Sequence, residues 1–389
     1  MTATHPAAPG LPVTADGLKW TRHPPDVLAA WVAEMDYGTA PPVRDAVEAA
    51  VRRGAFGYPD DRSRQDLTTA CADWLGRTHR WRVDPGQVFP LPDVVHGVRL
   101  ALEAHSAPGS PVILPVPAYP PLADVVRGSR RPLIEVPMSA TGGRPTLDPG
   151  SVDRAFAAGA RTLLLCNPHN PLGTVATERE LHGIAAVVDR HGGRVVADEI
   201  HSPLVFPGHR HVPYASLSDT AAQHTVTLVS ASKGWNIPGL KCAQAIVTSE
   251  RDRGIWSALP AAVTGLASPL GVVAGTAAYR HGDTWLAEVL RTLDTNRRLL
   301  ADLLDELLPA VRYRLPEGTY LAWLDFRALR LPAEPAEFWL REARVALSAG
   351  RPFGAPGAGH ARLNLATSAH ILDRLVRAMA DTTGRRAWN

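Results

Sequence analysis

Apolar residues in the middle of the chain gather in short runs, and longer amphipathic stretches separate these runs. The runs are rich in Val, Leu, Ile and Ala, as strands buried on both faces of a sheet are. The clearest amphipathic stretches lie near residues 94–106 and 177–191. This alternation predicts an α/β fold with a mostly parallel sheet covered by helices. The predicted strands are Pro111–Leu114, Leu133–Val136, Arg161–Cys166, Arg194–Asp198, Thr225–Ser230 and Ala243–Thr248.

The last third of the chain has a different pattern. Leucines recur on one face of a helix predicted over residues 285–308, and the strand-like runs Tyr320–Phe326 and Ala361–Leu365 follow it. With 389 residues, the chain is long enough for two domains. We predict an N-terminal segment packed near the small domain, a large domain, and a smaller α+β C-terminal domain, over residues 1–35, 36–284 and 285–389.

Residues 254–279 carry no charged side chain, so this stretch has to be weighed as a membrane span. It contains Pro260, Pro269 and four glycines, which suit a hydrocarbon-spanning helix poorly. We therefore predict a buried, broken helix and no membrane association.

Charge and cysteine content restrict the remaining classes. The net charge of +3 is spread thinly, without a basic block, and we expect no nucleic-acid partner. The three cysteines (Cys71, Cys166 and Cys242) have no CxxC or metal-ligand spacing. The N-terminus also lacks a charged stretch followed by an apolar run. A reduced chain in the cytoplasm is the expectation.

Lysine is rare in this chain. Of the 41 basic residues only Lys19, Lys233 and Lys241 are lysines, and the others are arginines. A lysine can lose its proton and act as a nucleophile or base, which a guanidinium does not do. Each lysine is therefore a candidate for chemistry that arginine cannot perform.

Polar groups follow three neighbouring predicted strands. One strand leads into Asn167–Gly173, with the sequence Asn-Pro-His-Asn-Pro-Leu-Gly, and the next ends in Asp198-Glu-Ile-His201. The third ends in Ser230-Ala-Ser-Lys-Gly234. Ligands of α/β sheets bind at the carboxyl ends of strands. An amide, a carboxylate and a lysine flanked by hydroxyls are thus expected to share one crevice.

These motifs resemble those of fold-type I enzymes that use pyridoxal 5′-phosphate (PLP), in the class I/II aminotransferase superfamily. The resemblance covers essentially the whole chain. It narrows to the subfamily of cystathionine β-lyase-like carbon–sulfur lyases. The features that narrow it are Trp31–Asp36, Phe56–Tyr58, Pro117–Tyr119, Ser232–Gly239 and Thr319–Asp325. The resemblance implies a large domain built on a mostly parallel sheet, a small C-terminal domain, and PLP as cofactor.

The resemblance assigns roles to the residues around the cofactor ring. Lys233 would form the Schiff base with PLP and later take the α-proton of the substrate. Asp198 would pair with the pyridine nitrogen, and Asn170 would donate to the phenolic oxygen of the ring. Tyr119 would stack on the ring face. His201 stands where aminotransferases commonly have Tyr and the lyase-like subfamily has His.

The resemblance also implies donors for the phosphate. Val94 and Val95 would supply backbone N–H groups at a helix N-terminus, which is a natural anion site. Ser230 and Ser232 would supply hydroxyls, and Lys241 stands where many aminotransferases place an Arg against the phosphate.

Substrate binding and assembly complete the predicted site. Arg362 would grip the substrate carboxylate bidentately, with Asn170, Tyr119 and Asp36 nearby. Tyr58 would reach the phosphate from the neighbouring subunit of a homodimer with shared sites. The small-molecule substrate would be an amino acid.

The predicted reaction is β-elimination from a cysteine S-conjugate or a cystathionine-like amino acid, which yields thiol, pyruvate and ammonia. Transamination, and a decarboxylating or oxidative deamination, remain alternatives, because small pocket changes redirect PLP chemistry. A non-catalytic binding protein on the same fold is a further alternative. Leu172 and Trp235 depart from the family pattern and keep the decarboxylating alternative open. Asp93 is a good N-cap, yet its charge would repel a phosphate if it faced inward.

Two further features are set aside. Gly354–Gly359 superficially resembles a phosphate loop but lacks the following Lys-Ser/Thr, so we predict a flexible loop. His209 and His211 have no third ligand at a suitable spacing, so no metal site is predicted.

Overall fold

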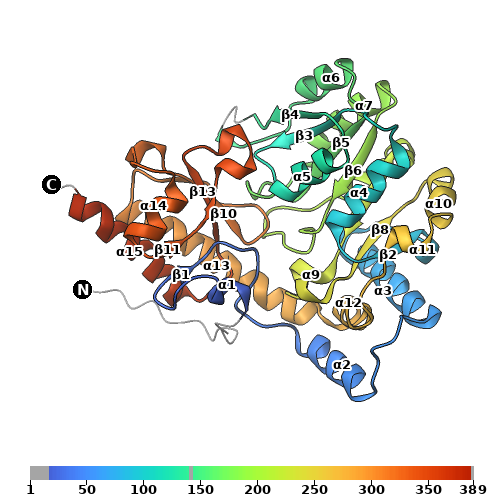
Figure 1. The fold of residues 1–389 in the computed structure, drawn as a ribbon, viewed down its shortest axis with the longest axis horizontal. Helices are drawn as coiled ribbons and strands as arrows, with labels where there is room; N and C mark the ends of the chain where they lie inside the picture. Colours follow the sequence, from blue (N-terminus) through green and yellow to red (C-terminus); the bar gives the residue numbers. More distant parts are fainter. Residues whose placement is uncertain (1–16, 140–142, 387–389) are drawn as a thin grey trace.

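The computed structural model describes residues 17–139 and 143–386, and a seven-stranded sheet forms the centre of its larger part (Figure 1). Five adjacent strands are parallel, and β8 runs antiparallel to both of its neighbours. The predicted fold, a mostly parallel sheet with a smaller C-terminal sheet, is confirmed. Across the large sheet the strands are β2 (Val88–Leu91), β8 (Ala243–Ile246), β7 (Thr225–Val229), β6 (Arg194–Asp198), β5 (Thr162–Cys166), β3 (Val112–Val116) and β4 (Leu133–Pro137).

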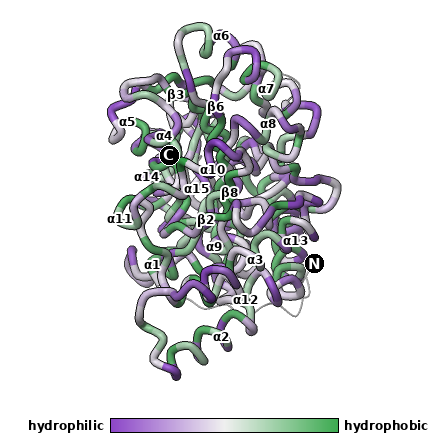
Figure 2. Tube along the Cα trace, turned by 90° about the vertical axis from the view of Figure 1, so that its right-hand side faces the viewer, coloured by the Kyte–Doolittle hydropathy of each residue, from purple (hydrophilic) through white to green (hydrophobic). Residues whose placement is uncertain are grey.

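Alternating side chains of the central strands bury both faces of this sheet. In β5, Leu164 belongs to one apolar core, whereas Leu163 and Leu165 belong to another. The first core includes the helices α4 (Val94–His105) and α5 (Pro120–Gly128), and the second includes α6 (Pro149–Ala157) and α7 (Glu178–Arg190). Three successive positions of this strand are therefore apolar, because helices cover the sheet on both sides. Figure 2 shows the same arrangement, with mostly hydrophobic strands in the middle and many hydrophilic stretches around them.

All six strands predicted for the large sheet are present, and their ends differ from the predicted ends by at most two residues. The strand β2 was missed. It contains Pro90 and lies at the edge of the sheet, paired only with β8. Proline is tolerated at an edge because its missing N–H costs no ladder bond there.

The C-terminal part has its own antiparallel sheet. Its strands, in order, are β12 (Ser348–Ala349), β13 (His360–Asn364), β10 (Leu321–Asp325) and β9 (Arg312–Tyr313). A separate pair joins β1 (Leu28–Ala29) to β11 (Val345–Ala346), so the N-terminal segment contacts the C-terminal part. The domain boundaries themselves stay a prediction.

Helices cover both sheets, and the predicted helices near 94–106, 177–191 and 285–308 are α4, α7 and α13. The helix α3 was not predicted. The helices are α1 (Leu18–Thr21), α2 (Pro41–Arg52), α3 (Asp61–His79), α4 (Val94–His105), α5 (Pro120–Gly128), α6 (Pro149–Ala157), α7 (Glu178–Arg190), α8 (Asp219–Gln223), α9 (Ala231–Gly234), α10 (Glu250–Ser257), α11 (Ala261–Thr264), α12 (Pro269–His281), α13 (Asp283–Leu307), α14 (Pro335–Glu342) and α15 (Ala369–Arg386).

The uncharged stretch at 254–279 is broken, as predicted, but only part of it is buried. It is divided among α10, α11 and α12, with breaks before Pro260 and Pro269. Most side chains of 257–266 are exposed or half-exposed, whereas most of those from Ala267 onward are buried. Over the described ranges, no helix combines the length and the apolar character that crossing a membrane requires.

The segment Gly354–Gly359 is a loop that contains a short turn, and its predicted flexibility stays a prediction. Two short 3₁₀ turns, Arg351–Phe353 and Ala355–Gly357, fold this segment tightly. A side chain on Gly357 would collide with the backbone of Gly350, so the glycine allows two chain segments to pack against each other.

Candidate active site

Three parallel strands deliver the predicted ring-binding residues to one edge of the sheet. The strands β5, β6 and β7 are neighbours, so their carboxyl ends lie side by side. Asn170 follows β5, Asp198 ends β6, and Lys233 lies in α9, directly after β7. The expected convergence of these residues at the carboxyl ends of the strands is therefore present.

Asp198 is a buried carboxyl group with few partners. Its Oδ1 accepts a hydrogen bond from the backbone N–H of Ile200 at 3.2 Å. Burial raises the pKa of Asp198 to about 6, and the nearby charge of Lys233 opposes that rise only in part. A carboxylate in this condition favours a cationic partner, such as a protonated ring nitrogen.

Lys233 is half-buried in the same site. Its Nζ donates to the carbonyl oxygen of Ala33 at 2.8 Å, and Tyr320 Oη donates to the same oxygen at 2.9 Å. Burial, followed by the positive charge of Arg362, lowers the pKa of Lys233 to about 8. A lysine with this pKa is neutral often enough near neutral pH to act as a nucleophile or base.

Arg362 comes from the small sheet and faces the same site. It lies in β13, and its Nη1 donates to Asn170 Oδ1 at 2.9 Å while Nη2 donates to the carbonyl of Trp31 at 3.3 Å. The guanidinium lies 5.1 Å from the centre of the Phe353 ring. Within the described part of the chain, its Nε is buried without a hydrogen-bond partner. Arg362 is thus fixed in place and retains a donor for an anion.

Two aromatic side chains lie near these charges. His201 is buried, its ring packs edge-on against Tyr320 at 6.2 Å, and burial lowers its pKa to about 3, so the imidazole is neutral. Tyr119 is half-buried at the start of α5, within electrostatic range of Arg362 and Asp198. The structure therefore brings both predicted residues to the site.

The N-terminus of α4 lies where the phosphate donors were predicted. The helix begins at Val94, and the N–H groups of its first turn have no partners within the helix. Asp93 is the N-cap, with Oδ1 accepting from His96 N at 2.8 Å. Its Oδ2 lies 3.1 Å from Nζ of Lys241, so the lysine faces the same helix end as Val94 and Val95.

The two serines differ in their availability. Ser230 Oγ donates its proton to the carbonyl of Cys242 at 2.7 Å and accepts from Ser232 N at 3.0 Å. Its hydroxyl is therefore already used in capping α9, against the prediction that it binds phosphate. The side chain of Ser232 is half-exposed, and its predicted role stays open.

The structure gives Asp36 and Trp235 other surroundings than expected. The carboxylate of Asp36 is bound by Lys19 Nζ at 2.9 Å and by Trp20 Nε1 at 2.9 Å, so it is not free for a substrate. Trp235 is fully buried among Trp74 and Tyr279 and does not flank the pocket. Its departure from the family pattern is a matter of core packing.

Tyr58 lies apart from the site within one chain. It follows α2 in the chain, and 85% of its side chain is exposed. It makes no part of the cluster around Lys233, which leaves the predicted contact with a second subunit as its candidate role.

Sequence reasoning missed the residues that support this cluster. Tyr320, whose Oη donates to Ala33 O, follows Thr319; the φ of Thr319, 67°, is rare for a β-branched residue and has to be held by the surrounding structure. Asn236 lies three residues after Lys233; its Oδ1 accepts from Met35 N at 2.9 Å, and its Nδ2 donates to Gly38 O at 2.8 Å. The Ser-Lys-x-x-Asn spacing was the available signal for this clamp.

A buried glutamate braces the loop that carries Asn170. Glu317 accepts from Arg144 at 2.8 Å and from Val175 N at 2.9 Å, and its own N–H donates to Gly173 O at 2.7 Å. Burial alone would raise the pKa of Glu317, but the Arg144, Val175 and Arg314 donors outweigh it and lower the pKa to about 2. The loop after β5 is therefore joined to the segment that precedes β10.

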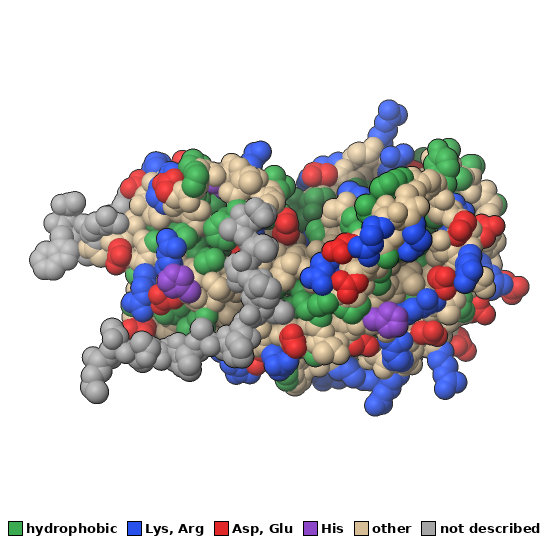
Figure 3. All heavy atoms as spheres, turned by 90° about the horizontal axis from the view of Figure 1, so that it is seen from below, with side chains coloured by type: hydrophobic (Ala, Val, Ile, Leu, Met, Phe, Trp, Pro, Cys, Tyr) green, Lys and Arg blue, Asp and Glu red, His purple; other side chains and the backbone are tan. Residues whose placement is uncertain are grey.

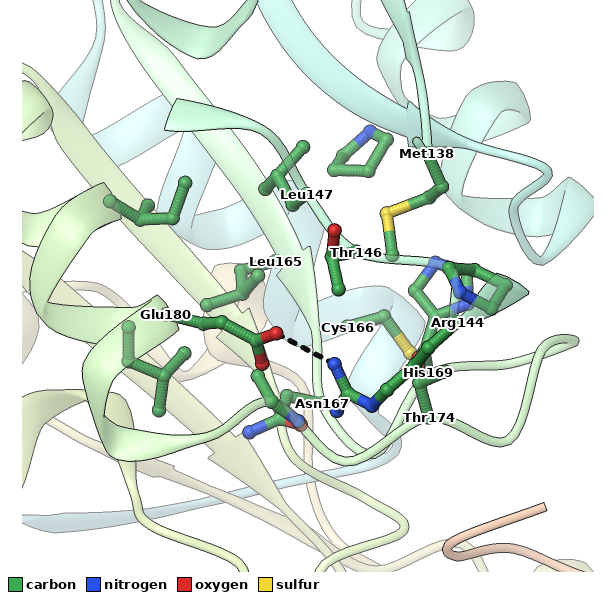
Figure 4. A pocket seen from close by; sticks show the side chains of 15 residues that line it. Met138, Arg144, Thr146, Leu147, Leu165, Cys166, Asn167, His169, Thr174 and Glu180 are labelled. Atoms are coloured by element: carbon green, nitrogen blue, oxygen red, sulfur yellow. Dashed lines mark hydrogen bonds and ion pairs between the residues drawn. The ribbon is translucent and has the colours of Figure 1, made fainter. Parts of the chain in front are cut away.

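A small pocket lies beside the same loop (Figure 4). Met138, Cys166 and His169 line it, together with Arg144, whose Nη1 donates to Glu180 Oε1 at 2.6 Å. None of the charged residues of the candidate active site lines this pocket. We therefore take this pocket as part of the support of the loop.

His211, which the sequence analysis considered as a metal ligand, is paired with a carboxylate. Its Nε2 lies 3.0 Å from Oε2 of Glu199, and both side chains are buried.

Comparisons with known proteins agree with this arrangement. The sequence profile of the aminotransferase class I and II family matches residues 31–379. The cystathionine beta-lyase of Corynebacterium glutamicum is 39% identical, across 93% of this chain and 95% of that protein. The cystathionine beta-lyase PatB of Bacillus subtilis (strain 168) is 34% identical, across 91% and 92% of the two chains. The crystal structure of cystalysin from Treponema denticola, which contains PLP, superposes with a TM-score of 0.90 at 26% identity, covering 95% of this chain and 96% of that one.

Proposed function

Because this chain belongs to the aminotransferase class I and II family, in its cystathionine β-lyase-like subgroup, we propose that it is a PLP-dependent carbon–sulfur β-lyase. The substrate is a thioether amino acid such as cystathionine or a cysteine S-conjugate. With one water it gives a thiol, pyruvate and ammonia. The observation that carries the proposal is the convergence of Lys233, Asp198, Asn170 and Arg362 in a chain that is 39% identical to a cystathionine beta-lyase.

The residues present fit PLP. Asp198 is a buried carboxyl group that favours a cationic partner, and Lys233 is a half-buried lysine with a lowered pKa. The first turn of α4, with Val94 and Val95, offers N–H groups to a phosphate. When bound, PLP supplies an electron-accepting ring that stabilises negative charge at the Cα of an amino acid.

Lys233 is the residue for covalent attachment and proton transfer. Once free of the cofactor, its neutral Nζ takes the proton from the substrate Cα. The carbonyl of Ala33 accepts from this Nζ at 2.8 Å, which gives the resulting ammonium a fixed position. The thiolate then leaves from Cβ.

Arg362 and Asn170 orient the substrate. The free Nε of Arg362 and its Nη groups bind the α-carboxylate, and the bond to Asn170 keeps the guanidinium from rotating. Fixing the carboxylate limits the directions in which the Cα–H bond can point, which is the main geometric demand of the reaction. Tyr119 closes one side of the site.

The active assembly in this proposal is a homodimer. Figure 3 shows apolar side chains between charged ones on the lower face, the side where Figure 1 places α2 and α12. Val51, Phe56 and Tyr58, which are at or just beyond the end of α2, are exposed large hydrophobic residues. Burial of this surface against a second copy would bring Tyr58 to the partner's phosphate site.

The reaction class is tested with purified protein, cystathionine and a panel of S-substituted cysteines. Pyruvate, ammonia and thiol should form in equal amounts without a keto acid, and Lys233→Ala should form none. Turnover that stops after one equivalent and resumes with 2-oxoglutarate would instead show transamination. Release of carbon dioxide without thiol would show a decarboxylating enzyme.

A further inference from the structure

One of the three lysines has no part in the reaction described above. Lys19 lies in α1, only 1% of its side chain is exposed, and its Nζ lies 2.9 Å from Asp36 Oδ2, on a side chain that is 2% exposed. Trp20 Nε1 donates to Oδ1 of the same carboxylate at 2.9 Å. Two charges so buried have lost their hydration, and such a pair is a costly way to gain stability alone.

The pair lies where two segments of the active site meet. The carbonyl of Ala366 accepts from Asp36 N at 3.0 Å and from Lys19 Nζ at 3.4 Å. Ala366 is four residues beyond Arg362 on the same stretch of chain. Lys19 thus connects the N-terminal segment to the strand that presents the predicted carboxylate-binding arginine.

The helix α1 also holds the first residue of the segment Trp31–Asp36. Trp31 Nε1 donates to the carbonyl of Lys19 at 3.0 Å, and the carbonyl of Trp31 accepts from Arg362 at 3.3 Å. Between Trp31 and Asp36 lies Ala33, whose carbonyl receives Lys233 Nζ. The helix α1 therefore fixes the chain on both sides of Ala33, whose carbonyl accepts the hydrogen bond from Lys233.

We propose that Lys19 and Asp36 are positioning residues, which hold Ala33 and Arg362 in the correct position relative to Lys233. This inference rests on the proposed function and deepens it. Asp36, which the sequence suggested as a substrate contact, acts through Lys19 instead. The lysine suits this place because its compact ammonium reaches both a carboxylate and a carbonyl in a closed space.

Four variants test this inference in the holoenzyme: Lys19→Met, Asp36→Asn, the double variant Lys19→Met/Asp36→Asn, and the control Arg344→Met. Arg344 Nε lies 2.7 Å from Asp26 Oδ2, and this ion pair also joins the N-terminal segment to the C-terminal part, but both side chains are exposed to solvent. Thermal unfolding, kcat and KM with cystathionine, and the rate at which apoprotein takes up PLP are measured for each.

The double variant is the decisive one, because it removes both buried charges together and should fold with a Tm close to that of the wild type. We expect its kcat/KM to fall at least about tenfold, since a misplacement of about 1 Å can cost about 10²-fold. The double variant should be no worse than the more impaired single variant. Arg344→Met should stay within about twofold of the wild type.

Two results would overturn the inference. One is a double variant with the kcat/KM of the wild type. The other is a double variant whose loss is the product of the two single losses, because Asp36 would then act on the substrate independently of Lys19. If the wild type cleaves no thioether, the proposed function fails. The rate at which Lys233 takes up PLP then decides whether Lys19 and Asp36 position the site. Slower uptake in the double variant than in the control supports positioning, and equal rates contradict it.

Discussion

At the scale of single residues, burial acts on Asp198 and Lys233 in opposite directions. It raises the pKa of the carboxyl group to about 6 and lowers that of the ammonium to about 8, so each group moves toward its neutral form. An aspartate with a raised pKa favours folding fully only below its unfolded pKa, and this contribution is lost as the pH rises through 6. The apoprotein therefore carries a cost at Asp198 that a cationic ring nitrogen would remove.

This cost leads to a prediction for Asp198→Asn. At pH 8 the variant apoprotein should be more stable than the wild-type apoprotein, by about 1–3 kcal/mol, because no buried charge remains. At pH 4 this difference in stability should nearly vanish. The pKa of Asp198 then lies above the pH in the folded protein and close to the pH in the unfolded chain, so little charge has to be buried. Thermal unfolding of the two apoproteins at both pH values measures it.

The same substitution should act in the reverse direction on the holoenzyme. An amide cannot pair with a protonated ring nitrogen, so PLP affinity and turnover should fall by at least about tenfold, the effect of roughly 1.4 kcal/mol. A stabilised apoprotein together with unchanged PLP affinity would contradict the assigned role of Asp198.

At the scale of an element, the N-terminus of α4 is capped by Asp93, whose negative charge lies beside the predicted phosphate site. Asp93 caps the helix through Oδ1 and binds Lys241 through Oδ2. The Lys241 side chain is 61% exposed, so this ion pair contributes little to stability. Its effect is electrostatic, because it places one negative and one positive charge beside the predicted phosphate site.

Asp93→Asn should separate the two functions of this residue. Asparagine keeps the cap, so stability should change little, but the negative charge is lost and PLP should bind several-fold more tightly. Lys241→Met should weaken PLP binding by a similar factor. Titration of the apoproteins with PLP, followed by visible absorbance, measures both effects.

Asp93→Ala serves as the matched control for capping. It should cost about 1 kcal/mol of stability through loss of the cap, while its gain in PLP affinity resembles that of Asp93→Asn. If neither Asp93 variant nor Lys241→Met changes PLP affinity, the phosphate does not bind at this helix end.

At the scale of the whole molecule, one chain holds the charged residues around Lys233 but leaves the side chain of Tyr58 85% exposed. A shared site in a two-fold dimer accounts for this exposure. The prediction of a homodimer therefore concerns catalysis as well as assembly. The cytoplasmic location expected from the cysteines stays a prediction.

Complementation tests the shared site. Tyr58→Asp puts a negative charge beside the phosphate, Lys233→Ala removes the base, and each variant alone should be inactive. After mixing and reassembly, about half of the dimers are mixed, and each has one site with both residues intact. About a quarter of the wild-type sites should recover. If size measurements show reassembly without recovered activity, Tyr58 serves the site of its own chain.

We expect histidines with lowered pKa values to dominate the response of the whole molecule to acid. Burial lowers the pKa of five histidines, and the groups concerned are His79 (about 2), His105, His169 and His224 (about 4) and His201 (about 3). Below pH 6.5 the unfolded chain binds protons that the folded chain does not, so stability falls as the pH drops. The pKa of Asp198 has the opposite effect, but it is a single group.

We expect the free energy of unfolding to fall between pH 7 and pH 5, by about 1–2 kcal/mol for each of these histidines. Denaturant unfolding across this range measures the slope. His79→Leu should reduce the slope by about a fifth, whereas replacing His182, which is exposed to solvent, should leave it unchanged. A flat profile would show that these histidines are protonated in the folded protein.

The sequence by itself determined the fold class and most of the central site. Apolar runs that alternate with amphipathic helices can be buried only in a covered parallel sheet, and the strands before Asn170, Asp198 and Lys233 end at one edge of it. The identity of these residues followed from local motifs. Local patterns report on neighbours along the chain, which is why strands β3 to β8 were predicted to within two residues while the edge strand β2 was not.

Only the tertiary structure decided which polar groups are free. Ser230 is used as a cap, Asp36 is bound by Lys19, and Trp235 lies in the core, although the motifs of all three had suggested the pocket. The carbonyl of Ala33 became visible as the acceptor of Lys233 only across 200 positions of sequence. A side chain's partner depends on which distant segment packs against it, and no local pattern of residue types contains that information.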